Sequence, residues 1–189
     1  MTTETTAAIA PEILPQGTWK LDPTHSTAGF AVKHMVVATF RGRFEDFDAS
    51  LTVGEDGAAQ LVGAVRADSI VVKDENLAAH LRSPEFFDTE RHPEIRYVSN
   101  AIRRDGDELV VDGELTIKDQ THAVAARGTI SGPAETVGDQ TKLGLSLETV
   151  VDRTRFGLTW NAPLPKGGVA VANEVTIGVE LELALAEEA

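Results

Sequence analysis

Cysteine is absent from this chain of 189 residues. Its absence excludes thiol catalysis, thiolate metal sites and disulfide bonds. The five histidines do not stand at the short spacings of His-x-His or His-Glu-x-x-His metal motifs. A phosphate-binding loop is also missing, because Gly167 and Gly168 follow Lys166 without the preceding strand and following helix that such a loop needs. We therefore expect neither a cofactor nor a metal ion.

Basic residues and long apolar runs are scarce. The chain has 17 lysines and arginines against 30 acidic residues, for a net charge of −13, which argues against nucleic-acid binding. No run approaches the roughly 18 apolar residues of a membrane span. Residues 1–17 lack the basic and apolar regions of a signal peptide. We expect a cytoplasmic protein with a disordered lead-in at 1–17, one domain at 18–185 and an acidic tail at 186–189.

Alternation of apolar and polar residues is the strongest pattern that is present. From Val175 to Leu185 every odd-numbered position is apolar, whereas Thr176, Glu180 and Glu182 lie on the other face. Residues 109–118 alternate in the same way. Further strands are expected over 26–34, 39–53, 60–72, 95–104, 121–131 and 142–152. About eight long antiparallel strands predict an all-β closed barrel in preference to a sandwich.

Three segments interrupt or end these strands. Between Phe44 and Phe47 the apolar positions change from even to odd, so a bulge or bend is expected at Glu45-Asp46. Residues 131–133, Ser-Gly-Pro, predict a turn that ends a strand. Residues 161–173, rich in Pro, Gly and Ala, predict a long mobile loop.

Residues 74–88 predict a short helical insertion between two strands. Asp74 is a suitable N-cap, and Leu77 and Leu81 share one helix face at i, i+4 spacing. Ser83-Pro84 then predicts a second helix start, with proline at the first helical position.

The segment from Asp22 to Ser26, DPTHS, raises the question of catalysis. Asp22 and His25 could form an acid–base dyad beside Ser26, but the Gly-x-Ser-x-Gly elbow is missing. We favour a turn at the rim of the barrel, in which Asp22 accepts backbone hydrogen bonds and Pro23 fixes φ. His25 and His34 have opposite parity, so on a regular strand they would face opposite sides.

The aromatic residues make up 5% of the chain and are candidates for a core or a pocket lining. A barrel of eight strands has an interior just wide enough to be filled or to hold one ligand. Small residues occupy many strand positions: Ala28, Gly42, Ala64, Gly113, Ala125, Gly128 and Gly144. They predict either a cavity or strong curvature of the strands.

A series of motifs resembles the YceI-like family of lipocalin-like barrels, often called polyisoprenoid-binding proteins. In order they are residues 19–26 (WKLDPTHS), 30–34 (FAVKH), 41–44 (RGRF), 67–70 (ADSI), 80–88 (HLRSPEFFD), 92–95 (HPEI), 111–117 (VDGELTI), 153–158 (RTRFGL) and 173–177 (NEVTI). The resemblance implies an elongated antiparallel barrel with a tunnel for a long isoprenoid or similar amphiphilic chain, and a homodimer. Leu145 stands where the family usually has Phe, which would widen or reshape the tunnel.

On this resemblance we expect a non-catalytic protein that binds, sequesters or transports a long-chain isoprenoid or quinone-like lipid. The expected ligand-binding residues are Phe30, Val32, His34, Phe40, Arg41, Phe44, Leu77, Leu81, Phe86, Phe87, Phe156 and Trp160. Two alternatives stay open. One is a barrel enzyme with His25 or His34 as acid or base on a small hydrophobic substrate, and the other is a stress-associated interaction module with a filled barrel.

Overall fold

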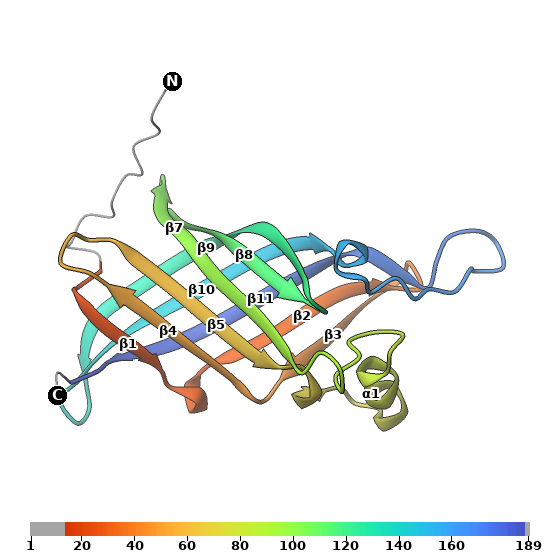
Figure 1. Cartoon of the computed structure of the whole chain (residues 1–189), viewed down its shortest axis with the longest axis horizontal. Helices are drawn as coiled ribbons and strands as arrows, with labels where there is room; N and C mark the ends of the chain where they lie inside the picture. The colour runs from red at the N-terminus through yellow and green to blue at the C-terminus, as the bar shows by residue number, and fades with distance from the viewer. Residues whose placement is uncertain (1–13, 188–189) are drawn as a thin grey trace, which may run out of the picture.

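The computed structural model describes residues 14–187, in which an antiparallel sheet curls into an elongated barrel (Figure 1). Its strands are β1 (Gly17–Leu21), β2 (Thr27–His34), β3 (Ala38–Phe44), β4 (Phe47–Val53), β5 (Ala59–Arg66), β6 (Ile70–Val71), β7 (Glu94–Asp105), β8 (Glu108–Ile117), β9 (Gln120–Thr136), β10 (Gln140–Asp152) and β11 (Val171–Leu185). Within this stretch, the helical elements are α1 (Glu75–Arg82) and the short 3-10 helices η1 (Pro23–His25), η2 (Ala67–Ser69) and η3 (Arg153–Phe156). Every segment in which alternation predicted a strand contains one.

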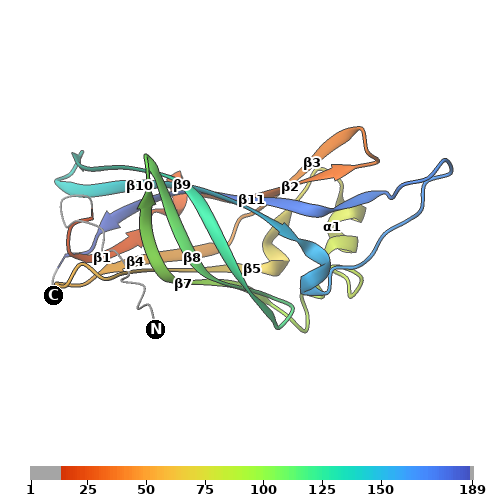
Figure 2. The same cartoon turned by 90° about the horizontal axis from the view of Figure 1, so that it is seen from above.

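The barrel closes through β1, which pairs with β4 on one side and with β11 on the other. The ring runs β1-β4-β5-β7-β8-β9-β10-β11, so the predicted closed antiparallel barrel of about eight strands is confirmed. β2 continues the course of β1 along β11, and β3 lies beside β2. Figure 2 shows that β2 and β3 extend the barrel at the end that also carries α1.

The predicted bend at Glu45-Asp46 is confirmed, because β3 ends at Phe44 and β4 begins at Phe47. Ser69 in η2 holds it. The backbone N–H of Glu45 donates to the Ser69 carbonyl at 3.2 Å, and that of Asp46 donates to Ser69 Oγ at 3.1 Å. These bonds satisfy two donors that the strand ladder leaves free. The change of phase turns Phe44 and Phe47 toward the same interior.

The helical insertion begins where predicted, since Asp74 Oδ1 accepts a hydrogen bond from Leu77 N at 2.8 Å. The second helix start predicted at Ser83-Pro84 is wrong. Ser83 ends α1 instead: its backbone N–H and its Oγ donate to the His80 carbonyl at 3.1 and 2.7 Å. Both donors of Ser83 are therefore used by the preceding helix, and the chain continues in turns.

β9 runs through the predicted turn at residues 131–133 and reaches Thr136, so the expected end of this strand is wrong. The opposing strand provides the reason. The register with β10 shifts between Lys142 and Gly144, and this bulge leaves Gly132 and Pro133 without ladder partners. Proline, which has no N–H to donate, is tolerated at such a position.

The interior is divided into two halves. In the filled half, around β1, a close-packed core includes Trp19, Leu51 and Leu183, each at most 1% exposed. Leu145, 3% exposed, packs in this core. The prediction that Leu145 reshapes a tunnel is therefore wrong. A second core in the hollow half, which includes Phe44, Leu115 and the residues of α1 that face inward, surrounds a cavity.

The predicted lead-in and tail lie mostly outside the described residues. Leu14, which the sequence analysis placed in the lead-in, is 3% exposed and belongs to the core of the filled half. Trp19 Nε1 donates to the Pro15 carbonyl at 3.1 Å, which ties this segment to β1. Among residues 14–187, no helix has the length and apolar character needed to cross a bilayer.

Candidate functional site

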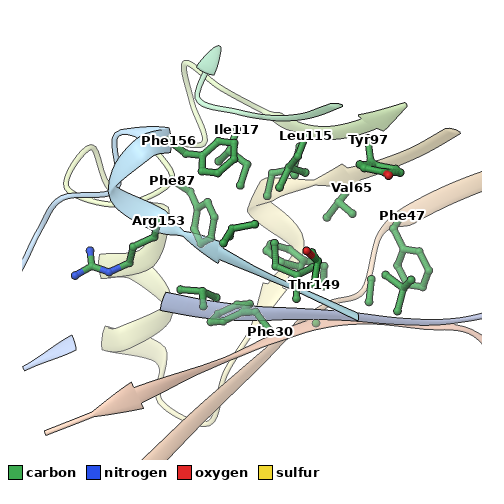
Figure 3. A pocket seen from close by; sticks show the side chains of 18 of the residues that line it. Phe30, Phe47, Val65, Phe87, Tyr97, Leu115, Ile117, Thr149, Arg153 and Phe156 are labelled. Atoms are coloured by element: carbon green, nitrogen blue, oxygen red, sulfur yellow. The ribbon is translucent and has the colours of Figure 1, made fainter. Parts of the chain in front are cut away.

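The hollow half of the barrel encloses a cavity of about 400 Å³ (Figure 3). Most of its wall consists of inward-facing side chains from β2, β3, β5, β7, β8, β10 and β11. The strand ladder is incomplete here, because β9 and β10 pair no further than Arg127 and Glu148. η3 packs beside this gap, where His122 Nε2 of β9 donates to the Arg155 carbonyl at 2.8 Å. The cavity volume lies within the range of ligand pockets.

Four phenylalanines form one side of the cavity. The Phe30 ring lies 6.1 Å from the rings of Phe40 and Phe44, and Phe44 meets Phe87 edge to face at 5.9 Å. Alternation on β2 and β3 directs the first three inward. Gly42 makes room for them, because a Cβ at Gly42 would lie 2.6 Å from the Phe30 ring. This small residue therefore marks close aromatic packing and not empty space.

α1 supplies part of the wall through Leu77 and His80. The His80 ring stands edge-on to Phe86 and to Trp160, with centroids 4.9 and 5.0 Å apart. Its Nε2 lies 2.7 Å from Glu85 Oε2. Aromatic contacts therefore join the helical insertion to the loop after η3 across the wall of the cavity.

The structure brings eleven of the twelve predicted site residues into the lining: Phe30, Val32, His34, Phe40, Phe44, Leu77, Leu81, Phe86, Phe87, Phe156 and Trp160. Arg41 is the exception and requires a correction. It follows Phe40 on β3, and alternation turns its side chain to the outer face, where it is exposed. The role of the other eleven in binding a ligand stays a prediction.

Tyr97 on β7 forms a floor between the two halves, because it packs against both cores. Its hydroxyl donates to the Val111 carbonyl at 2.8 Å. A Cβ at Gly113 would lie 2.7 Å from the phenol oxygen, so this glycine makes room for the ring. Burial raises the pKa of Tyr97 to about 12, and the nearby Asp112 carboxylate adds to the shift. The sequence analysis missed Tyr97, although it shares the inward parity of Ile95.

Small residues on the strands were predicted to mark either a cavity or strong curvature, and the structure contains a cavity beside one of them and a close approach of the backbone at another. On β5 both Gly63 and Ala64 line the cavity, and Gly63 shares the inward parity of Leu61 and Val65. A Cβ at Gly63 would meet only the Asp48 carbonyl, 3.9 Å away, so the space beyond it is free. Gly128 is the second case, because the backbone of β10 passes too close for any side chain there.

Arg153 is the second important residue that the sequence analysis missed. It is 6% exposed, and its guanidinium donates to four backbone carbonyls. Nη1 donates to the carbonyls of Leu158 and Trp160 at 2.5 and 3.0 Å. Nε donates to the Ala172 carbonyl at 2.9 Å, and Nη2 donates to the Val171 carbonyl at 3.3 Å. Burial lowers the pKa of Arg153 from its usual value. This side chain fastens both ends of the loop between η3 and β11 to the cavity wall.

Three polar side chains of the lining already have hydrogen-bond partners within the protein. Tyr97 donates to a carbonyl, Arg153 is surrounded by four, and Thr149 Oγ1 donates to the Ala125 carbonyl at 2.9 Å. His34 is exposed and lies where the lining meets solvent. The interior of the cavity therefore offers a ligand mainly apolar contact.

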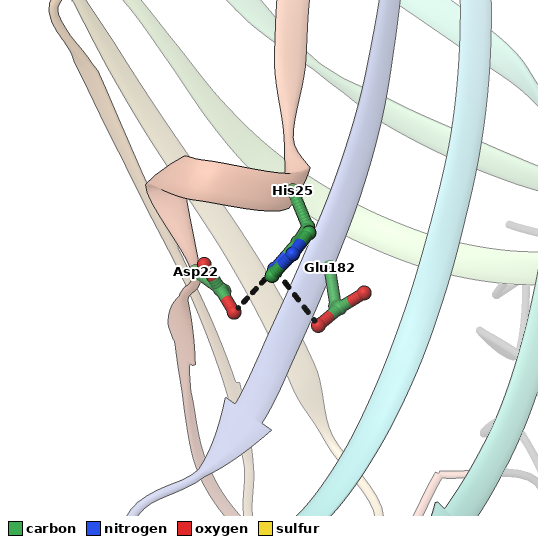
Figure 4. A group of neighbouring side chains, drawn as sticks. All are labelled: Asp22, His25 and Glu182. Atoms are coloured by element: carbon green, nitrogen blue, oxygen red, sulfur yellow. Dashed lines mark hydrogen bonds and ion pairs between the residues drawn. The ribbon is translucent and has the colours of Figure 1, made fainter.

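His25 lies outside the cavity, in a polar cluster on the outer face of the barrel (Figure 4). Its Nδ1 is 3.0 Å from Asp22 Oδ2 and 3.7 Å from Glu182 Oε1. Asp22 Oδ1 also accepts from Thr24 N at 3.0 Å, so the predicted turn is confirmed. The predicted position of this turn at the rim of the barrel is wrong, because the turn lies beside Glu182, between the parts of β11 that pair with β1 and with β2. The eight residues of β2 separate it from His34 by about 25 Å.

The same cluster has the side chains of a metal site, but Lys142 occupies the position that a metal ion would take. Asp22, His25 and Glu182 offer ligand atoms within 4.8 Å of one another. Lys142 Nζ, however, bonds Asp22 Oδ2 at 3.0 Å and Glu182 Oε1 at 2.6 Å. Because a cationic side chain already bridges the two carboxylates, the cluster is best described as an ion-pair network that joins the turn at η1 to β10 and β11.

We expect an Asp22→Asn variant to lose thermal stability in a pH-dependent manner. Hydrogen bonds from His25 and Lys142 hold the pKa of Asp22 below its usual value, and Asp22 raises the pKa of His25. The contribution of Asp22 is present above about pH 3.9 and disappears as pH falls through its lowered pKa. That of His25 is complete below about pH 6.5 and disappears as pH rises through its raised pKa. The difference in Tm from wild type should therefore be largest between about pH 4 and 6.5.

Thermal unfolding at a series of pH values measures this difference. Asparagine is as good an N-cap as aspartate, so the bond to Thr24 is retained, while the negative charge and the acceptor for His25 and Lys142 are removed. A Tm difference that stays constant from acidic to alkaline pH would show that the charge of Asp22 does not stabilise the fold through its titrating partner His25.

Comparison with known proteins follows the geometry. Residues 19–183 match the family described as the YceI-like domain. A UPF0312 protein of Photorhabdus laumondii is 30% identical over 110 residues, which is 57% of this chain and 57% of that relative's length. The aligned region thus spans less than two thirds of that relative.

Two solved structures share the fold. BcnA of Burkholderia cenocepacia superposes with a TM-score of 0.73 at 22% identity, over 86% of this chain and 98% of that protein. A domain of Saccharophagus degradans, described as polyisoprenoid binding, superposes with a TM-score of 0.62 at 12% identity, over 89% of this chain and 98% of that domain. At these identities the likeness concerns the fold.

Proposed function

This chain belongs to the YceI-like family, and from that premise we propose that it binds a long apolar chain of the isoprenoid class in the hollow half of its barrel, without catalysing a reaction on it. The observation that carries the proposal is the cavity of about 400 Å³, whose lining is mainly apolar and in which the Tyr97 and Thr149 hydroxyls already donate to backbone carbonyls. The description of the Saccharophagus domain supports the isoprenoid class.

The energetic basis is removal of the ligand from water. Each 100 Å² of apolar ligand surface that is buried contributes about 2.5 kcal/mol. In this proposal the phenylalanines around Phe30 and the apolar face of α1 contact the chain, and His34 lies nearest to a polar head group. The homodimer and the cytoplasmic location stay predictions.

The positions of the titratable groups support binding over catalysis. An acid–base role for either histidine requires it to face the substrate. His25 lies on the outer face, and His34 is exposed at the edge of the cavity. The Tyr97 hydroxyl already donates to the Val111 carbonyl, and burial raises its pKa further above neutral pH. The alternative of a filled barrel applies only to the half around Trp19, because the other half contains the cavity.

Organic extraction of the purified protein, followed by mass spectrometry, tests the proposal. We expect a lipid built of isoprene units, and we expect added polyprenol or quinone to raise the Tm of the delipidated protein, since a ligand that binds only the folded state stabilises it. A fatty acid of similar length is the control for ligand class. Protein that carries no lipid and whose Tm responds to none of these would refute the proposal, and a response to the fatty acid alone would refute the isoprenoid class.

A further inference from the structure

The turn between β2 and β3 presents three consecutive apolar side chains to solvent. Met35, Val36 and Val37 are 42%, 68% and 86% exposed. Met35 and Val36 also adopt φ angles of 50° and 67°, a region in which glycine or asparagine is ordinary and valine is disfavoured. Neither solubility nor backbone geometry favours these residues here. Their exposure therefore indicates contact with an apolar phase outside the chain.

A second loop adds to the same surface. Val169, which precedes β11, is 47% exposed. Met35 N donates to the Ala170 carbonyl at 2.8 Å, and a Cβ at Gly168 would lie 3.9 Å from Val36 Cγ2. Figure 2 shows both loops projecting from the same end of the barrel. The hydrophobic tip, as we name this surface, consists of Met35, Val36, Val37 and Val169.

The segments that carry the hydrophobic tip, residues 28–44 and 156–173, are basic within an acidic chain. They contain no aspartate or glutamate, although acidic residues outnumber basic ones 30 to 17 overall. Their lysines and arginines are all exposed: Lys33, Arg41, Arg43 and Lys166. Arg43 lies 3.1 Å from Glu45, at the border of this region. The lysines and arginines of the two segments that carry the tip thus add only positive fixed charge, and positive charge beside an apolar surface favours contact with anionic bilayers.

The hydrophobic tip is continuous with the cavity. His34 directly precedes Met35, and Val171 follows the second loop. His34 and Val171 pair across β2 and β11, and both line the cavity. The cavity lining therefore extends along β2 and β11 up to the last residue pair before the tip.

We propose that the hydrophobic tip inserts into the interface of an anionic lipid bilayer and brings the cavity opening to the membrane. The apolar side chains enter the region between head groups and acyl chains, while the surrounding lysines and arginines contact lipid phosphates. The contact with the membrane stands independently of the cavity ligand. Its purpose, exchange of an apolar chain between bilayer and barrel, rests on the proposed function.

Cosedimentation of the full chain with vesicles tests the proposal. We expect binding to vesicles of phosphatidylcholine mixed with phosphatidylglycerol, and weaker binding as salt is added, because salt screens exposed charges. A Val36→Asp, Val37→Asp variant should bind these vesicles at least tenfold more weakly. Val137→Asp is the matched control: Val137 is 100% exposed in the turn between β9 and β10, and its replacement should leave binding unchanged.

The outcomes separate this proposal from the previous one. Membrane docking would be overturned if the wild-type protein bound neither vesicles of phosphatidylcholine alone nor vesicles that also contain phosphatidylglycerol. It would also be overturned if the tip variant bound vesicles as well as the wild type. Equal binding to both kinds of vesicle would overturn the role of charge. A tip variant that changes the oligomeric state in solution and not vesicle binding would make the tip a self-association surface. Lipid extraction from the same samples reports the cavity ligand separately, so either proposal can fail alone.

Discussion

An Arg153→Met variant is expected to lose about 3–5 kcal/mol of free energy of unfolding. Methionine fills much of the volume of arginine but donates no hydrogen bonds. The carbonyls of Leu158, Trp160, Val171 and Ala172 would lose the guanidinium that now bonds all four. Buried acceptors without donors are costly, and the loop between η3 and β11 would lose its fastening. Urea unfolding followed by tryptophan fluorescence measures the loss.

Arg155→Met is the matched control, because Arg155 lies in the same short helix but is exposed. Its guanidinium makes one side-chain hydrogen bond, to His122 Nδ1 at 3.2 Å. We expect this variant to lose less than about 1 kcal/mol. Equal losses in the two variants would show that Arg153 contributes no more than an exposed arginine.

A Gly63→Phe variant is expected to weaken binding of an apolar chain by roughly 70-fold. The new ring enters the free space beyond Gly63 and takes part of the cavity from the ligand. If it displaces about 100 Å² of ligand contact, the loss is about 2.5 kcal/mol. Titration with a polyprenol, monitored by the change in tryptophan fluorescence, measures the Kd.

Gly178→Phe controls for the general effect of an aromatic residue on a strand. Gly178 lies on β11 between Ile177 and Val179, which face inward, so its own side chain would point outward. A Cβ there would have no neighbour within 4 Å. This variant should keep the wild-type Kd. If Gly63→Phe also kept it, the ligand would not occupy the space beside β5.

The architecture was predictable from the sequence because it depends on alternation, which is a local property. The odd-numbered apolar positions of β11 and the change of parity at Glu45-Asp46 both correspond to what the structure contains. The errors arise where a contact from elsewhere in the chain decides. Pro133 predicted a turn, but a bulge opposite it lets β9 continue. Ser83 predicted a new helix, but its donors serve α1.

The site was predictable in its aromatic part and not in its polar part. Large apolar side chains of known parity point inward wherever the barrel closes. The prediction that Arg41 binds the ligand was wrong because membership of a motif says nothing about the direction of a side chain. Arg153 and Tyr97 were missed because their importance comes from burial and from carbonyls that only the folded chain brings near. The division into a filled and a hollow half also depends on three-dimensional packing.

That division has a consequence for how this protein can change over generations. A substitution beside Trp19 alters a close-packed core and endangers the fold. A substitution that projects into the cavity, as at Gly63, meets open space and changes mainly what fits inside. The filled half thus tolerates few changes, and the hollow half is free to acquire new ligand preferences while the barrel remains intact.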